Sequence, residues 1–219
     1  MHTPQGASIE RAFDQGFKIA AKRYLVVFLN YIILYIITVP ILVGITWLLV
    51  WTTQIGIIFA VIALILFPAF YGGFYGSLVR IGRGEPGQIG DFLKIGFNKF
   101  GPLLGATILY LLGVIVGLML FLIPGIYLII AWFFVPFLIV DKNLPITKAF
   151  SESMRLIHKK VGWWKTFGLI FFLLLISFGI GIISVIPFIG FVIYILVPIF
   201  LAPFLYMVCA IYYIDSVRN

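Results

Sequence analysis

Residues 102–140 read PLLGATILYLLGVIVGLMLFLIPGIYLIIAWFFVPFLIV and contain no charged side chain. A helix that spans a bilayer needs about 20 predominantly apolar residues, so this run is long enough for two spans, expected at 102–123 and 125–140. Pro124 and Gly125 separate them, because proline ends one helix and glycine tolerates the dihedral angles of a tight turn. The stretch therefore predicts a transmembrane hairpin.

Two more hairpins of the same kind flank this one. Their spans are expected at 24–50 and 55–79 before it and at 164–186 and 189–213 after it, and their turns carry no charge. The composition agrees, since 63% of the 219 residues are hydrophobic and 10% are charged, whereas soluble domains have about 25% charged residues. We expect an all-α integral membrane protein, with six transmembrane helices in a single domain, 1–219.

The charges are gathered on one side of these spans. All 15 lysines and arginines lie before the first span, between the second and third, between the fourth and fifth or at the start of the fifth, or after the sixth. Short loops rich in Lys and Arg stay in the cytoplasm, so both termini are predicted to be cytoplasmic in a multi-pass protein of the cell membrane. A net charge of +8 suggests nucleic acid in a soluble protein, but this placement argues against a nucleic-acid partner.

The polar segments before each hairpin have a helical period. In 8–23, 89–100 and 145–161, apolar side chains recur every three or four residues, and charged side chains lie on the opposite face. Such helices lie in the membrane interface or pack on neighbouring helices, and both alternatives stay open. With the hairpins they predict three repeats of an amphipathic helix, a span, a tight turn and a return span. The approximate units are 8–80, 88–141 and 145–215.

Each return span contains an interior proline, Pro68, Pro136 or Pro203. A proline in a membrane helix frees a carbonyl group and bends the helix, so three kinks in equivalent positions are predicted. Small residues four positions apart let helices approach closely in a bilayer. Three such pairs predict close helix contacts: Gly72 and Gly76, Gly101 and Gly105, and Gly113 and Gly117.

The chain offers little for catalysis or cofactor binding. Ser151 and His158 share one polar helix, but a helix rises about 10 Å over seven residues, which is too far for a hydrogen bond between them. Cys209 is the only cysteine and forms no metal-ligand pattern with the two histidines. We therefore predict no catalytic residue, no metal site and no cofactor, and a protein that is not an enzyme.

The basic residues around the amphipathic helices are the best candidate site. Near a membrane surface each Lys or Arg can add about 1 kcal/mol of attraction to anionic lipid. The predicted partners are therefore membrane lipids, above all anionic ones, with a second copy of the chain or another membrane protein as a further possibility. The expected headgroup ligands are Lys18, Lys22, Arg23, Arg80, Arg83, Lys94, Lys99, Lys159, Lys160 and Lys165.

The alternative function is a transporter or channel for a small or amphiphilic substrate, formed by the three bent helices. Asn30, inside the first span, is the best polar candidate for a pore or pocket, although its amide can also bond to neighbouring helices. Apart from Lys165 at the very start of the fifth span, no Lys, Arg, His, Asp or Glu lies within the expected spans. Because such residues usually mark ion-coupled transport, a proton-driven pump is disfavoured.

Several short motifs are similar to those of one family. They are YGGFYG at 71–76, RGE at 83–85, DFL at 91–93, IPGI at 123–126, PFLIVD at 136–141 and KAFSES at 148–153. Over roughly residues 60–180 the chain resembles small prokaryotic membrane proteins related to the membrane domain of glycerophosphoryl diester phosphodiesterase. The resemblance implies a lipid-associated membrane module. It implies no enzyme, because the 219 residues leave no room for the soluble phosphodiesterase barrel.

Overall fold

The computed structural model describes residues 8–51, 53–183 and 189–218. In this part of the chain every regular element is a helix, which confirms the predicted all-α class. The elements are α1 (Ile9–Lys22), α2 (Tyr24–Trp51), α3 (Thr53–Gly82), α4 (Asp91–Asn98), α5 (Phe100–Leu120), α6 (Leu122–Ala131), α7 (Val135–Lys142), α8 (Ile146–Arg155), the π-helical turn η1 (Leu156–Val161), α9 (Trp163–Ile183) and α10 (Ile189–Arg218).

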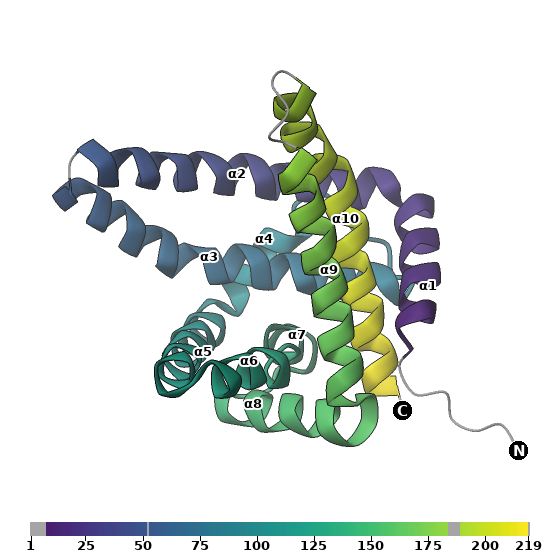
Figure 1. The fold of residues 1–219 in the computed structure, drawn as a ribbon. Coiled ribbons are helices and arrows are strands. Elements are labelled where there is room, and N and C mark those ends of the chain that lie inside the picture. Colours follow the sequence, from purple (N-terminus) through teal and green to yellow (C-terminus); the bar gives the residue numbers. More distant parts are fainter. Residues whose placement is uncertain (1–7, 52, 184–188, 219) are drawn as a thin grey trace, which may run out of the picture.

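Three long helical hairpins dominate the architecture. They are α2 with α3, α5 with α6 and α7, and α9 with α10. Figure 1 shows α2 and α3 running crosswise to α9 and α10, while α5 is seen nearly end-on, so the hairpins run in three directions. The C-terminal ends of α3 and α7 meet α10, because Gly82 lies beside Ile214 and the ring of Phe137 stacks on Tyr213 with centroids 5.1 Å apart. We call this meeting region the base.

Several helices are long and apolar enough to cross a membrane. Within the described residues these segments are Val61–Gly82, Phe100–Leu120, Leu122–Lys142, Trp163–Ile183 and Ile199–Arg218. A sixth candidate is the pair Ile9–Lys22 and Tyr24–Val39, which is bent by 92° at its break. These lengths and compositions are those of a membrane protein, and five to six spans agree with the hairpins expected from the sequence. The cytoplasmic placement of the base stays a prediction.

Helix α1 packs its small residues against α10. Its first turn is capped by Ser8, whose Oγ accepts a hydrogen bond from the Arg11 backbone N–H at 3.2 Å, as expected of a serine at this position. Ala12, Gly16 and Ala20 form the buried face, and Gly16 lies against the backbone of Val208 in α10. The small residues of the apolar face are therefore covered by another helix, whereas Phe17 is 37% exposed and most of the charged residues remain exposed.

Helix α4 crosses α3 at a direct backbone contact. A Cβ atom placed on Gly73 would overlap the carbonyl oxygen of Phe92, and one placed on Gly96 would overlap the carbonyl oxygen of Ala69. Glycine is the one residue type without a Cβ, so only glycine fits at either position. The close approach also buries Phe92 fully, with its ring 6.5 Å from that of Phe74 in an edge-to-face arrangement.

The return span of the second hairpin is interrupted between α6 and α7, immediately before Pro136. The buried Ser153 of α8 satisfies backbone groups at this break. Its Oγ accepts a hydrogen bond from the Phe134 N–H at 3.2 Å and donates one to the Ala131 carbonyl at 2.8 Å. A break inside a membrane is tolerated when a neighbouring helix re-satisfies the backbone in this way.

The other two prolines lie inside continuous helices. Pro68 is within α3 and Pro203 is within α10, and bends at these two positions stay predictions. The helix order α1–α2–α3, α4–α5–α6/α7 and α8/η1–α9–α10 follows the three units expected from the sequence. The threefold repeat itself also stays a prediction.

Most of the predicted glycine pairs lie at helix contacts. Gly72 faces Leu103 of α5, Gly76 faces Ile95 and Val140, Gly105 faces Ile146, Gly113 faces Trp132, and Gly117 faces Gly125. The prediction is wrong for Gly101, which has no neighbour within 4 Å of its Cβ position among the described residues. Gly101 lies in the first turn of α5, where that helix has no packing partner on this side.

Replacing Gly96 by alanine should destabilise the protein, because the new Cβ would force α4 away from α3. Overpacking of a filled core position typically costs about 1–3 kcal/mol, and a clash with a backbone oxygen should lie at the upper end. Gly101→Ala is the matched control: it adds the same atom into open space, where alanine favours a helix over glycine by up to about 1 kcal/mol.

The comparison is made by thermal unfolding of the detergent-solubilised protein, followed by circular dichroism. Gly96→Ala should melt at a lower temperature than the wild type, and Gly101→Ala should melt at the same or a higher one. Equal melting temperatures for the two variants would contradict the close crossing of α3 and α4.

Candidate functional site

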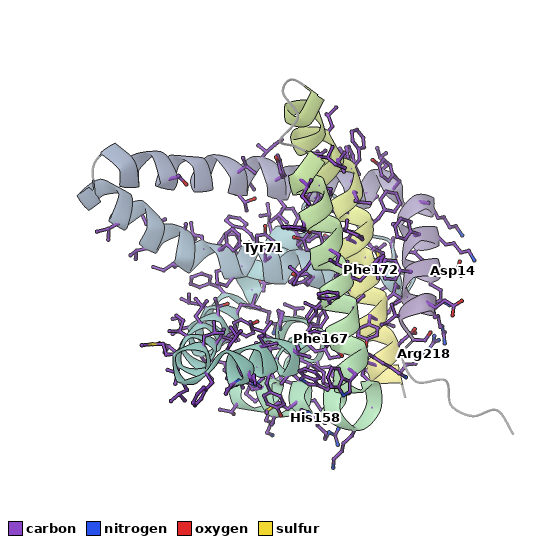
Figure 2. All side chains as sticks on the ribbon, viewed as in Figure 1. Asp14, Tyr71, His158, Phe167, Phe172 and Arg218 are labelled. Carbon is purple, nitrogen blue, oxygen red and sulfur yellow. The ribbon has the colours of Figure 1, made fainter. Side chains whose placement is uncertain are left out.

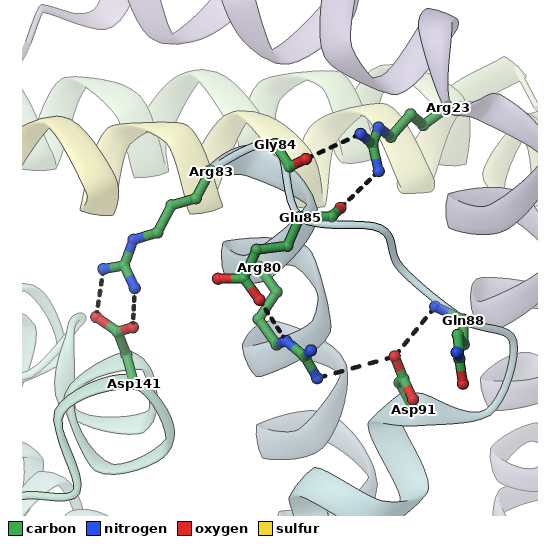
Figure 3. A network of polar contacts seen from close by, with 8 residues as sticks. All are labelled: Arg23, Arg80, Arg83, Gly84, Glu85, Gln88, Asp91 and Asp141. Carbon is green, nitrogen blue, oxygen red and sulfur yellow. Dashed lines mark hydrogen bonds and ion pairs between the residues drawn. The ribbon is translucent and has the colours of Figure 1, made fainter.

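One carboxylate at the base joins all three hairpins (Figure 3). Both terminal nitrogens of Arg83, just after α3, donate to the two oxygens of Asp141 in α7, with Nη2 and Oδ2 2.7 Å apart. The hydroxyl of Tyr213 in α10 donates to the same Oδ2 at 2.8 Å. The Asp141 side chain is 7% exposed and that of Arg83 is 38% exposed. The hydrogen bond to Asp141 raises the pKa of Arg83 above its ordinary value, so the guanidinium stays charged.

The loop between α3 and α4 is held by two further arginines. Arg80 pairs with Glu85 at 2.8 Å and with Asp91 at 3.9 Å. Arg23, at the bend between α1 and α2, donates hydrogen bonds to the carbonyl oxygens of Gly84 and Glu85. Figure 3 shows these residues converging on the loop from α3, α4 and the α1–α2 bend. The loop is therefore a structural junction.

Asn30 holds the same loop from the other side. Its side chain is almost fully buried, at 1% exposed. Its Nδ2 donates to the Gln88 carbonyl at 3.2 Å, and its Oδ1 accepts from the Gly90 N–H at 2.7 Å. Both ends of the amide are thus used to fix backbone atoms, so the geometry gives Asn30 a structural role.

The predicted headgroup ligands divide into two groups in the structure. Arg23, Arg80 and Arg83 form the hydrogen bonds and ion pairs described above with other groups of the chain. Lys18 pairs with Asp14 at 2.8 Å. The remaining six have no acidic partner within 4 Å among the described residues: Lys22, Lys94, Lys99, Lys159, Lys160 and Lys165.

Three of these lysines gather around the start of α9. Lys159 and Lys160 lie in the π-helical turn η1, and Lys165 is in the first turn of α9. All three side chains are exposed. Trp164 lies between them in the sequence and is 77% exposed. An exposed tryptophan beside lysines is the composition expected where a helix enters the headgroup region of a membrane.

The polar residues of α8 and η1 do not form a catalytic pair. His158 Nε2 lies 3.0 Å from the Tyr127 hydroxyl, and its Nδ1 lies 2.8 Å from the Met154 carbonyl. Ser151 donates to the Lys148 carbonyl at 3.1 Å, so the serine and the histidine have different partners. Across the described residues no group of three His, Cys, Asp or Glu side chains could hold a metal ion.

A cavity of about 750 Å³ lies where the three hairpins converge. Its walls come from α3, α5, the α6–α7 junction, α9 and α10, and no charged residue lines it. Pro68 and Pro136 line the cavity, whereas Pro203 and Asn30 do not. Figure 2 shows Tyr71, one of the lining residues, between the hairpins, while the charged Asp14 and Arg218 lie at the edge beside α1 and the end of α10.

Aromatic rings close the cavity toward the base. The lining residue Tyr75 packs on Phe137 with centroids 4.6 Å apart, and Phe137 stacks on Tyr213. Tyr213 in turn bonds to Asp141. The ion pair of Arg83 and Asp141 therefore lies directly beyond the aromatic floor of the cavity.

The alternative function placed a pore or pocket between the three bent helices, with Asn30 as its polar residue, but it did not identify the aromatic residues that line the cavity. Among them is Trp132, whose ring also contacts Tyr110 and Phe150. A usable signal was the spacing of Tyr71 and Tyr75, since residues four apart lie on the same face of a helix. Two hydroxyl groups on one face of an apolar span indicate an interior surface, because hydroxyl groups avoid hydrocarbon.

Removing either member of the Arg83–Asp141 pair should destabilise the base. Arg83→Ala and Asp141→Ala should each cost about 1–3 kcal/mol, since a largely buried charge or the Tyr213 hydroxyl then loses its partner. The double variant should lose less than the sum of the two, by about 1 kcal/mol or more. The measurement is the free energy of unfolding in a mixed-micelle denaturation series.

The exposed pair of Asp14 and Lys18, with side chains 57% and 73% exposed, provides the control. Asp14→Ala should change the free energy of unfolding by less than about 1 kcal/mol. Strict additivity of Arg83→Ala and Asp141→Ala would show that the two side chains do not interact.

Comparison of the chain with models of known families, with curated proteins and with solved structures yields no match. The resemblance to proteins related to the membrane domain of glycerophosphoryl diester phosphodiesterase therefore stays a prediction.

Proposed function

We propose that this chain is a non-enzymatic membrane protein of the prokaryotic cell membrane, which engages anionic lipids through the lysines at its base. Its six spans would be three repeats of one helix-and-hairpin unit, with the base and both termini on the cytoplasmic side. The observation that carries the proposal is that six of the expected headgroup ligands, all of them lysines, have no acidic partner among the described residues.

The arginines among the expected headgroup ligands have partners within the chain and most of the lysines have none, and this difference supports the proposed function. Arginine forms paired hydrogen bonds with carboxylates and carbonyl oxygens. Arg23 and Arg83 use that geometry within the chain, and Arg80 donates a single bond to Glu85. A lysine is a flexible point charge, and the six unpaired lysines keep their charge available. A lipid phosphate is a partner of matching sign at the surface where such lysines are expected to lie.

Lys159, Lys160 and Lys165 form the strongest part of this surface. They lie within one short segment, and the exposed Trp164 between them has the amphipathic ring that favours headgroup depth. Together the three charges would contribute about 3 kcal/mol of attraction to an anionic membrane. A membrane protein or a second copy that carries acidic residues would be recognised by the same charges, and lipid is the partner we propose.

Transport of a small or amphiphilic substrate is the second candidate function, and the cavity favours it. The cavity is lined by two of the three return-span prolines, which would allow its walls to bend. The Arg83–Asp141 pair and the aromatic floor close it toward the base, so transport would require the base to open. Flux of an uncharged fluorescent solute through proteoliposomes, faster for Arg83→Ala than for the wild type, would favour this candidate.

Neutralising Lys159, Lys160 and Lys165 to glutamine should reduce the preference for anionic lipid. At about 1 kcal/mol for each charge, the ratio of retained phosphatidylglycerol to phosphatidylcholine should fall by about a hundredfold at most and about tenfold at least. The ratio is measured by native mass spectrometry of the protein released from nanodiscs that contain equal amounts of the two lipids.

A pair of single substitutions controls for the loss of charge alone. Lys165→Gln removes an unpaired charge, whereas Lys18→Gln removes one already neutralised by Asp14. Only Lys165→Gln should lower the ratio. An unchanged ratio in the triple variant would refute lipid binding by these lysines.

A further inference from the structure

We propose that the cavity between the hairpins binds one hydrocarbon chain of a membrane lipid, with the headgroup remaining outside. This site does not depend on the lysines of the base, so it stands or falls separately from the proposed function. Its walls come from all three hairpins, and the argument rests on their chemistry, on the closed floor and on the available volume.

The lining excludes charged ligands. No Lys, Arg, His, Asp or Glu is among the lining residues, and apolar side chains provide most of the wall. An ion or a charged headgroup in this space would lose its hydration without gaining a counter-charge, which is strongly unfavourable. The apolar part of a ligand is therefore the part that fits.

The wall offers few polar groups. The Tyr71 hydroxyl interacts with the neighbouring side chains of Thr38 and Tyr206, so it has polar neighbours without a polar ligand. A buried water needs two to four polar partners, and this wall offers few. The candidate spans that line the cavity are apolar enough to lie in the hydrocarbon of a membrane. Lipid chains would therefore surround the cavity at high concentration.

The size and walls of the cavity suit a single chain. A volume of about 750 Å³ lies within the range of about 300–1,000 Å³ found for small-molecule sites. Ring pairs such as Phe67 with Tyr71, whose centroids are 4.2 Å apart, offer flat apolar faces for methylene groups. Tyr75 and Phe137 close the end near the base, so the chain would enter from the side away from the base.

The test is photo-crosslinking with phosphatidylcholine that carries a diazirine in one acyl chain. The purified full-length protein is reconstituted in nanodiscs with this probe, irradiated, digested and mapped by tandem mass spectrometry. Labels are expected on lining residues from different hairpins, such as Tyr75, Thr107 and Cys209. Phosphatidylglycerol with the same labelled chain should give the same cavity labels at similar yield, because the chain and not the headgroup is bound.

Two neighbouring residues of α5 give matched variants. Thr107 lines the cavity, whereas Ile108 does not and is 45% exposed. Thr107→Phe should fill the cavity and reduce labelling at the other lining residues by about tenfold, as expected from overpacking of an occupied site. Ile108→Phe should leave those labels unchanged. Cys209→Phe fills the cavity from the opposite wall and replaces Thr107→Phe if that variant does not fold.

Three outcomes would overturn the proposal. The first is labelling confined to the exposed faces of α5 and α9 in the wild type, a result that needs no variant. The second is equal cavity labelling in Thr107→Phe and Ile108→Phe. The third is cavity labelling by phosphatidylglycerol alone, since the headgroup would then control entry. The lysine triple variant should keep its cavity labels, which separates this site from the lipid surface at the base.

Discussion

The backbone contact between Gly73 and Gly96 sets the distance between α3 and α4, and the base of the molecule is built on that distance. Because the two helices touch without intervening side chains, Asp91 at the start of α4 lies within reach of Arg80 in α3. The same contact places the connecting loop beside Asn30, which holds it through two hydrogen bonds. Larger residues at the crossing would separate the helices, and the polar contacts around this loop would lose their geometry.

The base collects the charges and the interior stays uncharged, and one physical reason explains both features. A charged group in hydrocarbon is costly, so ion pairs form where the helices end, as in Arg83 with Asp141 and Arg11 with Asp215. With the hairpins joined at these ends, they are free to run in different directions (Figure 1). The cavity lies at their convergence, and its aromatic floor separates it from the ion pair.

The candidate site could be predicted only in part. The sequence identified the basic residues as a set, yet it could not distinguish a lysine without a partner from an arginine held by a carboxylate far along the chain. Arg83 and Asp141 are separated by 58 positions, and no local pattern connects them. Asn30 was a reasonable polar candidate, but its partners at Gln88 and Gly90 come from a loop whose path depends on the crossing of α3 and α4.

The sequence by itself determined the all-helical class and the approximate ends of the long helices, because hydrophobic length acts locally. The turn expected at Pro124 and Gly125 was wrong, since both residues lie in the first turn of α6 and the chain breaks at Phe121. The sequence also placed Phe92 and Gly96 on one face of α4 through their spacing of four residues. Only the tertiary structure decided which helices touch, that Ser153 satisfies the break before Pro136, and that aromatic residues of three hairpins enclose a cavity. These features depend on contacts between residues far apart in the chain, and in a uniformly apolar sequence many pairings have similar hydrophobicity. Backbone fit and a few polar bonds therefore select among them.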